Sequence, residues 1–171
     1  MAELPIITIP DPLLREVSTP VETVNNGVLR LLDDMLETMY EAPGIGLAAV
    51  QVGVLKRLVV IDIGDEEDED AKRPICMINP EIVSRDGEPS LYEEGCLSIP
   101  DIKVDVERPS LCTVRFIDRD GKQIELETDG LLAKAIQHEV DHLDGRLIID
   151  HLSRLKREMV IRKFKKLQRT A

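Results

Sequence analysis

The pentapeptide HEVDH (residues 138–142) constrains this chain more than any other feature of the sequence. It lies in a segment, residues 130–143, whose apolar spacing predicts a helix. Side chains four positions apart lie on one helix face, about 6 Å apart, so both imidazoles can bind one metal ion. Leu131 and Ala135 extend the same stripe. The spacing therefore predicts a buried helix face that carries two metal ligands.

Glu139 follows the first of these histidines and can act as general base toward a water on the metal, as in other HExxH sites. The competing interpretation is two core histidines with an unrelated glutamate between them. A catalytic site also needs a third protein ligand. Ile148 occupies the position where a metzincin has its third histidine, and Glu158 lies in a basic segment, so neither supplies it.

The remaining candidates for the third ligand are cysteines. Cys76 and Cys112 lie in strand-like apolar patterns and are interpreted as inert core residues. Cys96 differs because it lies in a Gly- and Pro-bounded segment, EGCLSIP, which is expected to be irregular. A site with one thiolate and two imidazoles suits Zn²⁺ or Fe²⁺. From the residues alone, Cys96 can be either the third metal ligand or a packing residue.

The pattern of elements predicts an α+β fold, with mixed or antiparallel β-sheets packed around the HExxH helix and with N-terminal and C-terminal helices. Helices are expected over residues 25–41 and about 153–168, in addition to the HExxH helix. Strands are expected at residues 58–63, 76–84, 102–106, 111–117 and 123–127. No linker or repeat interrupts residues 1–171, which predicts a single domain.

The chain is acidic, with a formal net charge of −11, but the charge is unevenly distributed. Residues 151–171 contain eight Lys or Arg and one acid, which leaves about −18 on the remainder. Such an acidic body, with 2% aromatic residues, argues against sequence-specific nucleic-acid binding. Six consecutive acids at residues 65–70 predict a solvated loop.

Three cysteines without a CxxC pair predict a reducing compartment. The N-terminal residues lack the features of a signal peptide, and no segment has the length of a membrane span. We therefore expect a cytoplasmic protein with no membrane partner.

Three motifs in this order resemble the signature motifs of the peptide deformylases: GIGLAAVQ (residues 44–51), EGCLS (94–98) and QHEVDH (137–142). The similarity covers nearly the whole chain, and the helical C-terminus is most similar to the bacterial type I group. The resemblance implies a metal-dependent hydrolase that removes the N-formyl group from the N-terminal methionine of nascent polypeptides and releases formate.

The resemblance also implies roles for individual residues. The implied metal ligands are Cys96, His138 and His142. They would hold one Fe²⁺ per chain, with Zn²⁺, Ni²⁺ or Co²⁺ able to substitute. Glu139 would take a proton from water and pass it to the departing amine. The side-chain amide of Gln51 and the backbone N–H of Leu97 would stabilise the oxyanion.

Further residues are expected to bind substrate or to orient the ligands. The expected substrate-binding residues are Gly44, Ile45, Gly46, Leu131 and Lys103. Lys103 stands where many relatives have an arginine. The residues expected to orient the ligands are Glu94, Gln137 and Asp141. Lys134 borders the expected side-chain pocket and either narrows it or points to water. His151 is interpreted as a surface or packing residue.

The basic C-terminal helix suggests contact with ribosomal RNA, and the resemblance to bacterial relatives implies the same. The alternative is a solvated face whose apolar side packs on the core, through Leu155, Met159, Ile161, Phe164 and Leu167. Two other functions compete with deformylation. One is a small metallopeptidase that uses the same HExxH chemistry, and the other is a non-enzymatic domain with a structural metal.

Overall fold

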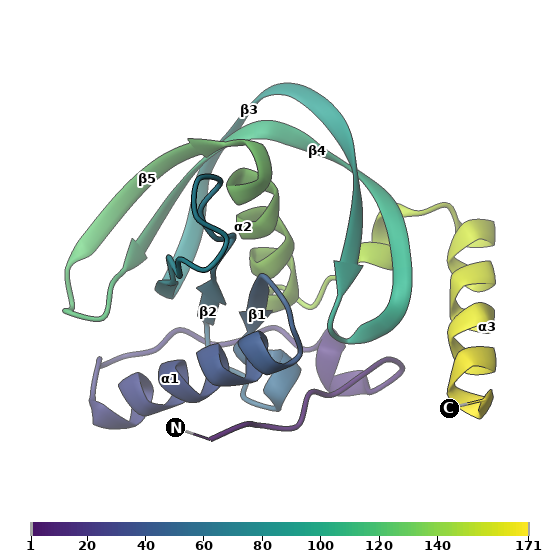
Figure 1. Ribbon diagram of the computed structural model, residues 1–171, viewed down its shortest axis with the longest axis horizontal. Helices are drawn as coiled ribbons and strands as arrows, with labels where there is room; N and C mark the ends of the chain where they lie inside the picture. Colours follow the sequence, from purple (N-terminus) through teal and green to yellow (C-terminus); the bar gives the residue numbers. More distant parts are fainter. Residues whose placement is uncertain (1, 171) are drawn as a thin grey trace.

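The structure is a computed structural model and describes residues 2–170 (Figure 1). Within residues 2–170, three α-helices and three short 3₁₀ helices combine with a five-stranded sheet. The helices are α1 (Asn26–Glu41), α2 (Gly130–Leu143) and α3 (Arg154–Thr170), with η1 (Pro12–Arg15), η2 (Ala49–Val52) and η3 (Ile148–His151). The strands are β1 (Gly46–Ala48), β2 (Leu58–Ile61), β3 (Ile75–Cys96), β4 (Ile99–Ile117) and β5 (Gln123–Asp129).

The strands follow one another in the sheet in chain order, β1-β2-β3-β4-β5, and each pairs with the next in antiparallel orientation. The predicted α+β fold is confirmed. The sequence predicted mixed or antiparallel sheets, and the sheet observed is antiparallel. The predicted strands at residues 58–63, 76–84, 111–117 and 123–127 are all found in it, with shifted ends.

Strand β2 shows how the sheet is buried on both faces. Its four residues are all fully buried, and successive side chains point to opposite faces. Val59 and Ile61 pack in one hydrophobic cluster with α2, whereas Leu58 and Val60 pack in a second cluster with α1. The short strand is therefore a continuous apolar run because a helix covers each side of it.

Helix α1 begins where the sequence predicts. The side chain of Asn25 caps it by accepting a hydrogen bond of 2.9 Å from the Val28 amide, which satisfies one of the free N–H groups of the first turn. Its buried face consists of Val28, Leu32, Met35, Thr38 and Met39. The expected boundaries of residues 25–41 are thus confirmed to within one residue.

Strands β3 and β4 form a long ribbon that arches over α2 (Figure 1). The sequence divides this ribbon incorrectly. It predicts a strand that ends at Ser84, and it predicts two separate strands, at residues 102–106 and 111–117, where β4 is continuous. Pro89 and Pro109 face each other across the ribbon, next to a register shift. Proline cannot donate to the strand ladder, so the ribbon bends at this point without ending.

The segment EGCLSIP is irregular as expected, although it lies within the ribbon. Cys96 ends β3, Ile99 begins β4, and these two residues pair across a two-residue turn after a register shift between Gly95 and Cys96. The segment GIGLAAVQ, residues 44–51, contains the three residues of β1 followed by the start of the 3₁₀ helix η2.

Helix α2 occupies its predicted range but is buried more completely than one apolar stripe would suggest. Every residue from 133 to 143 is buried, including Lys134, Gln137 and Asp141. The arch of β3 and β4 covers the side that would otherwise face solvent. Asp129 precedes the helix, and its side chain makes no capping hydrogen bond.

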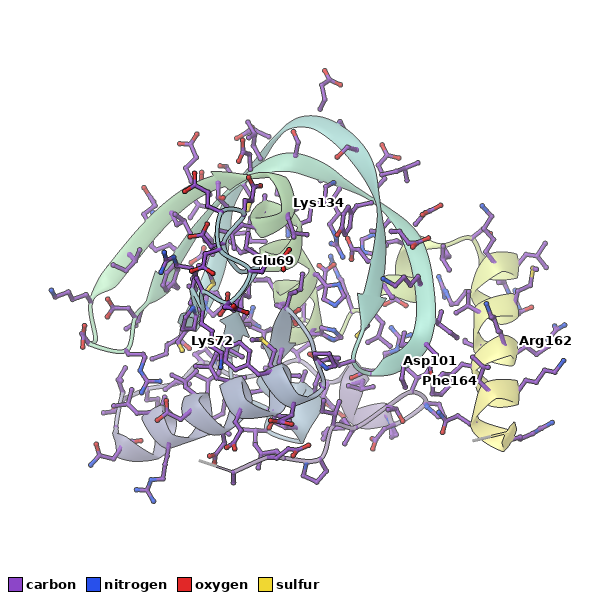
Figure 2. The ribbon with its side chains drawn as sticks, in the orientation of Figure 1. Glu69, Lys72, Asp101, Lys134, Arg162 and Phe164 are labelled. Carbon is purple, nitrogen blue, oxygen red and sulfur yellow. The ribbon has the colours of Figure 1, made fainter. Side chains whose placement is uncertain are left out.

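Helix α3 packs on the remainder of the molecule through only part of its apolar side. Phe164 is 3% exposed, and Ile161 and Leu167 pack against the same cluster. Leu155 and Met159, expected on this packed side, are instead 68% and 58% exposed. Figure 2 shows Arg162 pointing away from the body of the molecule on the same helix. Over residues 2–170, no helix is long and apolar enough to cross a membrane.

Candidate metal centre

The structure brings Cys96, His138 and His142 together from two different elements. Cys96 is the last residue of β3, and both histidines come from α2. One ligand atom from each of the three lies within 4.8 Å of the other two, and Cys96 Sγ is 3.3 Å from His142 Nε2. Both histidines are buried and Cys96 is half-buried. These are the three residues that the resemblance implies as ligands.

The surroundings of this cluster fit a soft divalent metal ion. Burial alone would raise the pKa of the Cys96 thiol, but the neighbouring His142 and His138 outweigh it and lower that pKa to about 5. A thiolate with two imidazoles is a donor set that suits Zn²⁺ or Fe²⁺. Glu139 Oε1 is also buried at this site without a hydrogen-bond partner among the described residues. A buried polar atom of this kind usually has a ligand or water beside it.

Glu94 orients the first imidazole. It lies on the same face of β3 as Cys96, two residues earlier, and its Oε1 is 2.9 Å from His138 Nδ1. A carboxylate only accepts hydrogen bonds, so Nδ1 carries the proton and Nε2 is left as the ligand atom. Burial raises the pKa of the Glu94 carboxyl, but its contacts with His138 and Arg108 outweigh burial and lower that pKa below its ordinary value.

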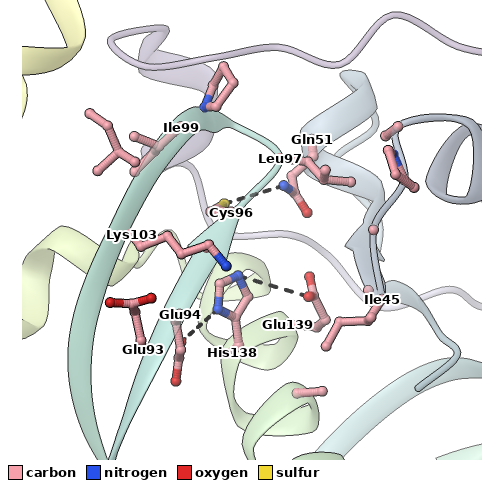
Figure 3. Close-up of a pocket in the computed structure, with 18 of the residues that line it drawn as sticks. Ile45, Gln51, Glu93, Glu94, Cys96, Leu97, Ile99, Lys103, His138 and Glu139 are labelled. Carbon is pink, nitrogen blue, oxygen red and sulfur yellow. Dashed lines mark hydrogen bonds and ion pairs between the residues drawn. The ribbon is translucent and has the colours of Figure 1, made fainter. Parts of the chain in front are cut away.

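Glu139 faces the same cluster from α2 (Figure 3). Its Oε2 is 3.9 Å from His138 Nε2, and burial raises the pKa of its carboxyl. Gly46 of β1 lies directly beside the Glu139 carboxylate, and a Cβ added at Gly46 would overlap that carboxylate. Glycine is therefore required at residue 46 because the carboxylate occupies the space of a side chain.

The replacement Gly46→Ala is expected to displace the Glu139 carboxylate rather than the backbone, because the carboxylate is the far end of a flexible side chain. A misplacement of about 1 Å costs roughly 100-fold in catalysis. We expect kcat to fall by about that factor while the bound metal, measured by elemental analysis, stays at the wild-type level. Unchanged kcat would show that the position of Glu139 is not critical.

Gln51 is held rigidly by its own neighbours. Its Oε1 accepts a hydrogen bond of 2.9 Å from the Ala48 amide, and its Nε2 donates to Ser98 Oγ over 3.0 Å. The same Nε2 lies 3.7 Å from Cys96 Sγ. One amide proton is thus directed toward the metal centre. Leu97 lies beside this group, and its side chain fills the space next to Gly44.

A cavity of about 690 Å³ opens beside the cluster, between β1, the β3–β4 ribbon and α2. All five residues expected to bind substrate line it, namely Gly44, Ile45, Gly46, Leu131 and Lys103. Cys96, Gln51, His138 and Glu139 line the same cavity (Figure 3). Ile45 is 44% exposed, so a large apolar side chain stands at its mouth.

Lys134 lines the cavity but does not point to water. Its ammonium donates to the backbone carbonyls of Ser90, over 2.9 Å, and Arg108, over 3.3 Å. These two residues are register partners in β3 and β4. Lys134 therefore connects α2 to the bend of the ribbon. The sequence left two alternatives, a Lys134 that narrows the pocket and one that points to water, and the structure favours the first.

The other residues expected to orient the ligands also contact the ribbon. Gln137 donates to the carbonyl of Pro109 over 3.0 Å. Asp141 Oδ2 accepts from Arg108 Nη1 over 2.9 Å and lies 3.2 Å from His151 Nε2. Burial raises the pKa of Asp141, but His151 and Arg108 outweigh it and lower that pKa to about 2. His151 thus packs against a buried carboxylate.

Sequence reasoning missed Arg108, which is 4% exposed and paired with two buried carboxylates. A signal for it exists in the alternation of β4, where Ile102, Val104 and Val106 are buried and their neighbours are exposed. Arg108 occupies the next inward position. A charged residue at an inward position implies a buried partner of opposite charge.

Comparison with known proteins gives one consistent result. Residues 3–158 match the family model described as polypeptide deformylase. The chain is 58% identical over 166 residues to a peptide deformylase of Rhizobium meliloti, covering 97% of this chain and 94% of that protein.

Two solved structures resemble the whole fold. One is a peptide deformylase from Legionella pneumophila, with a TM-score of 0.91, 47% identity and coverage of 99% of this chain and 97% of that one. The other is a peptide deformylase from Ehrlichia chaffeensis in complex with actinonin, with a TM-score of 0.92, 42% identity and coverage of 99% of each chain. With this match over nearly its full length and with a Cys/His/His cluster beside a cavity, the chain belongs to the peptide deformylase family of metallohydrolases.

Proposed function

We propose that this deformylase hydrolyses the formamide bond of N-formylmethionyl nascent peptides, releasing formate and a free amino terminus. The observation that carries the proposal is the buried carboxylate of Glu139, which has an unpartnered oxygen beside the Cys/His/His cluster. Both groups line a cavity that is open enough for the end of a peptide. We also propose that residues 1–171 act as one domain, because β4 contributes to both the cluster under α2 and the cluster under α3.

Cys96, His138 and His142 would hold one metal ion, which we propose to be Fe²⁺, with Zn²⁺, Ni²⁺ or Co²⁺ able to replace it. When bound, such a metal lowers the pKa of water and so supplies a nucleophile at neutral pH. Glu94 fixes the proton of His138 on Nδ1, which leaves Nε2 free as a ligand atom.

The remaining steps belong to side chains of the chain itself. Glu139 Oε1 has no competing hydrogen bond among the described residues, so it can accept the proton of the attacking water. It then delivers this proton to the departing amine nitrogen. Gln51 Nε2 donates one N–H to Ser98 Oγ and directs the other toward Cys96 Sγ, where it would donate to the developing oxyanion. The backbone N–H of Leu97 is proposed as the second donor.

The substrate would lie along residues 44–46, where Gly44 and Gly46 line the cavity and leave room for Leu97 and Glu139 beside it. Leu131, from the first turn of α2, would contact the methionine side chain in the cavity wall. Lys103 would contact the following residues at the mouth, as a point charge rather than as the fork that arginine provides. Because nascent chains are made in the cytoplasm, we propose that the reaction takes place there.

The test is formate release by Fe²⁺-loaded protein, purified anaerobically, from a formyl-Met tripeptide and from its acetylated and free-amine counterparts. We expect formate from the formyl peptide alone. Cleavage of the free-amine peptide without formate would favour a metallopeptidase. No reaction with any of the three, with metal confirmed bound, would favour a structural metal site.

We further propose that α3 contacts the ribosome. Its basic residues other than Arg157 are exposed, and Leu155 and Met159 add an apolar stripe that nothing in residues 2–170 covers. A surface with both basic and apolar groups suits an RNA-protein partner better than a merely solvated helix face.

Substitutions on α3 test this contact more cleanly than a deletion, because truncation would remove Phe164 from the core. We expect the double variant Arg162→Glu/Lys166→Glu to bind ribosomes more weakly while it deformylates short peptides at the wild-type rate. The matched control is Arg30→Glu/Lys122→Glu, which makes the same charge change at exposed residues elsewhere. Ribosome binding equal to that of the control would reject the contact.

A further inference from the structure

Arg108 connects the metal centre to the rest of the fold. It comes from β4 and is 4% exposed, and its guanidinium makes three hydrogen bonds to buried carboxylates. Nε donates to Glu94 Oε2 over 2.7 Å and Nη2 to Glu94 Oε1 over 3.0 Å. Nη1 donates to Asp141 Oδ2 over 2.9 Å. One side chain thus joins β3, β4 and α2.

The bidentate contact determines how Glu94 presents its oxygens. A guanidinium is a rigid planar fork, so two parallel hydrogen bonds fix the plane of the carboxylate as well as its position. Glu94 Oε1, held by Nη2, is also the atom that lies 2.9 Å from His138 Nδ1. The orientation of the His138 ring therefore depends on the Arg108 fork through a single shared oxygen.

The third hydrogen bond acts on the helix that carries both histidines. Asp141 precedes His142 in α2, and its contact with Arg108 ties this turn to β4. Cys96 belongs to β3, so the thiolate and the imidazoles come from elements that could shift relative to each other. Arg108 holds a carboxylate on each of these elements at once.

Stability alone does not account for this arrangement. Three charged groups buried together incur a large desolvation cost, and apolar packing of equal volume often stabilises a fold as well or better. The exposed pair Arg115–Glu125, in the same strand and its neighbour β5, provides the ordinary case of a surface ion pair, with side chains 43% and 56% exposed.

We propose that Arg108 is a positioning residue for the metal centre, which sets the orientation of the ligand His138 through Glu94. The inference rests on the proposed metal site. Arg108 belongs neither to the cluster nor to the residues that line the cavity, so its effect on the metal passes through the carboxylates that it holds.

The test measures the affinity of the metal-free protein for Zn²⁺ alone, by competition with a chelator, in Arg108→Lys and Arg108→Gln. Lysine keeps the positive charge between the two carboxylates, so this variant keeps the protein folded even where Arg108→Gln does not. Arg108→Lys loses only the planar guanidinium fork that makes two hydrogen bonds to Glu94. We expect Arg108→Lys to bind Zn²⁺ about 10- to 100-fold more weakly, the usual cost of losing an outer partner of a metal ligand. The matched control Arg115→Gln is expected to bind as the wild type does.

A double substitution separates positioning from a general loss of stability. If Arg108 acts through Glu94, then Arg108→Lys is expected to cause little further loss of affinity in a Glu94→Gln background. A loss that is equally large in that background would overturn the route through Glu94. Wild-type affinity in Arg108→Lys, with only a lower melting temperature of the metal-free protein, would show that Arg108 is purely structural. Absence of Zn²⁺ binding by the wild type would instead overturn the proposed metal centre itself.

Discussion

Glu139→Gln is expected to reduce kcat for a formyl-Met peptide by about 10²- to 10⁴-fold, the range over which general acid–base catalysis contributes. Glutamine preserves the volume of the side chain but cannot accept the proton from water. The bound metal is expected to remain at the wild-type level, because the three atoms that form the cluster come from Cys96, His138 and His142. Steady-state kinetics and elemental analysis of the same preparation measure both quantities.

The matched control for this prediction is Glu127→Gln, which makes the same change at an exposed position of β5. It is expected to leave both kcat and metal content unchanged. Near-wild-type kcat in Glu139→Gln would remove Glu139 from the proton-transfer role. Loss of metal together with activity would indicate that the carboxylate belongs to the ligand set.

Cys96→Ser is expected to weaken metal binding by more than the roughly 100-fold that loss of an outer partner costs. A serine hydroxyl is a hard and weakly acidic donor, whereas a thiolate is soft and matches Fe²⁺ or Zn²⁺. The position suits a thiolate in particular, because His142 and His138 lower the pKa of the Cys96 thiol to about 5 against the effect of burial. Titration of the metal-free protein with Zn²⁺ against a chelator measures the change.

Cys112→Ala is the control for this experiment, since Cys112 is a buried free cysteine that packs in the cluster under α2 and outside the metal centre. It is expected to bind Zn²⁺ with wild-type affinity even where it lowers the melting temperature. Unchanged affinity in Cys96→Ser would mean that the third ligand is another residue.

The sequence by itself was sufficient wherever a feature depends on residues near one another in the chain. The two histidines four positions apart predict their common helix face, and Asn25 predicts the start of α1 through its own hydrogen bond to Val28. Both depend on local geometry within one turn of helix. The three motifs also pointed to the family, which the comparisons confirm.

From the residues alone, the third ligand could not be assigned. Cys96 is 42 residues before His138, and it reaches the histidines because β3 ends beside them, after a register shift in its pairing with β4. The sequence also predicted shorter strands than the ribbon that β3 and β4 form. Proline and glycine normally end strands, but the pairing of β3 with β4 continues through Pro89 and Pro109 by means of a register shift.

Only the tertiary structure decided which polar residues of α2 are buried and what holds them. Lys134 and Asp141 lie outside the apolar stripe of α2, and the arch of β3 and β4 covers them and supplies their partners. Arg108 reaches Glu94 across the ribbon and Asp141 across the space between sheet and helix. These contacts depend on how separate elements pack, and a buried charge finds its partner in three dimensions rather than along the chain.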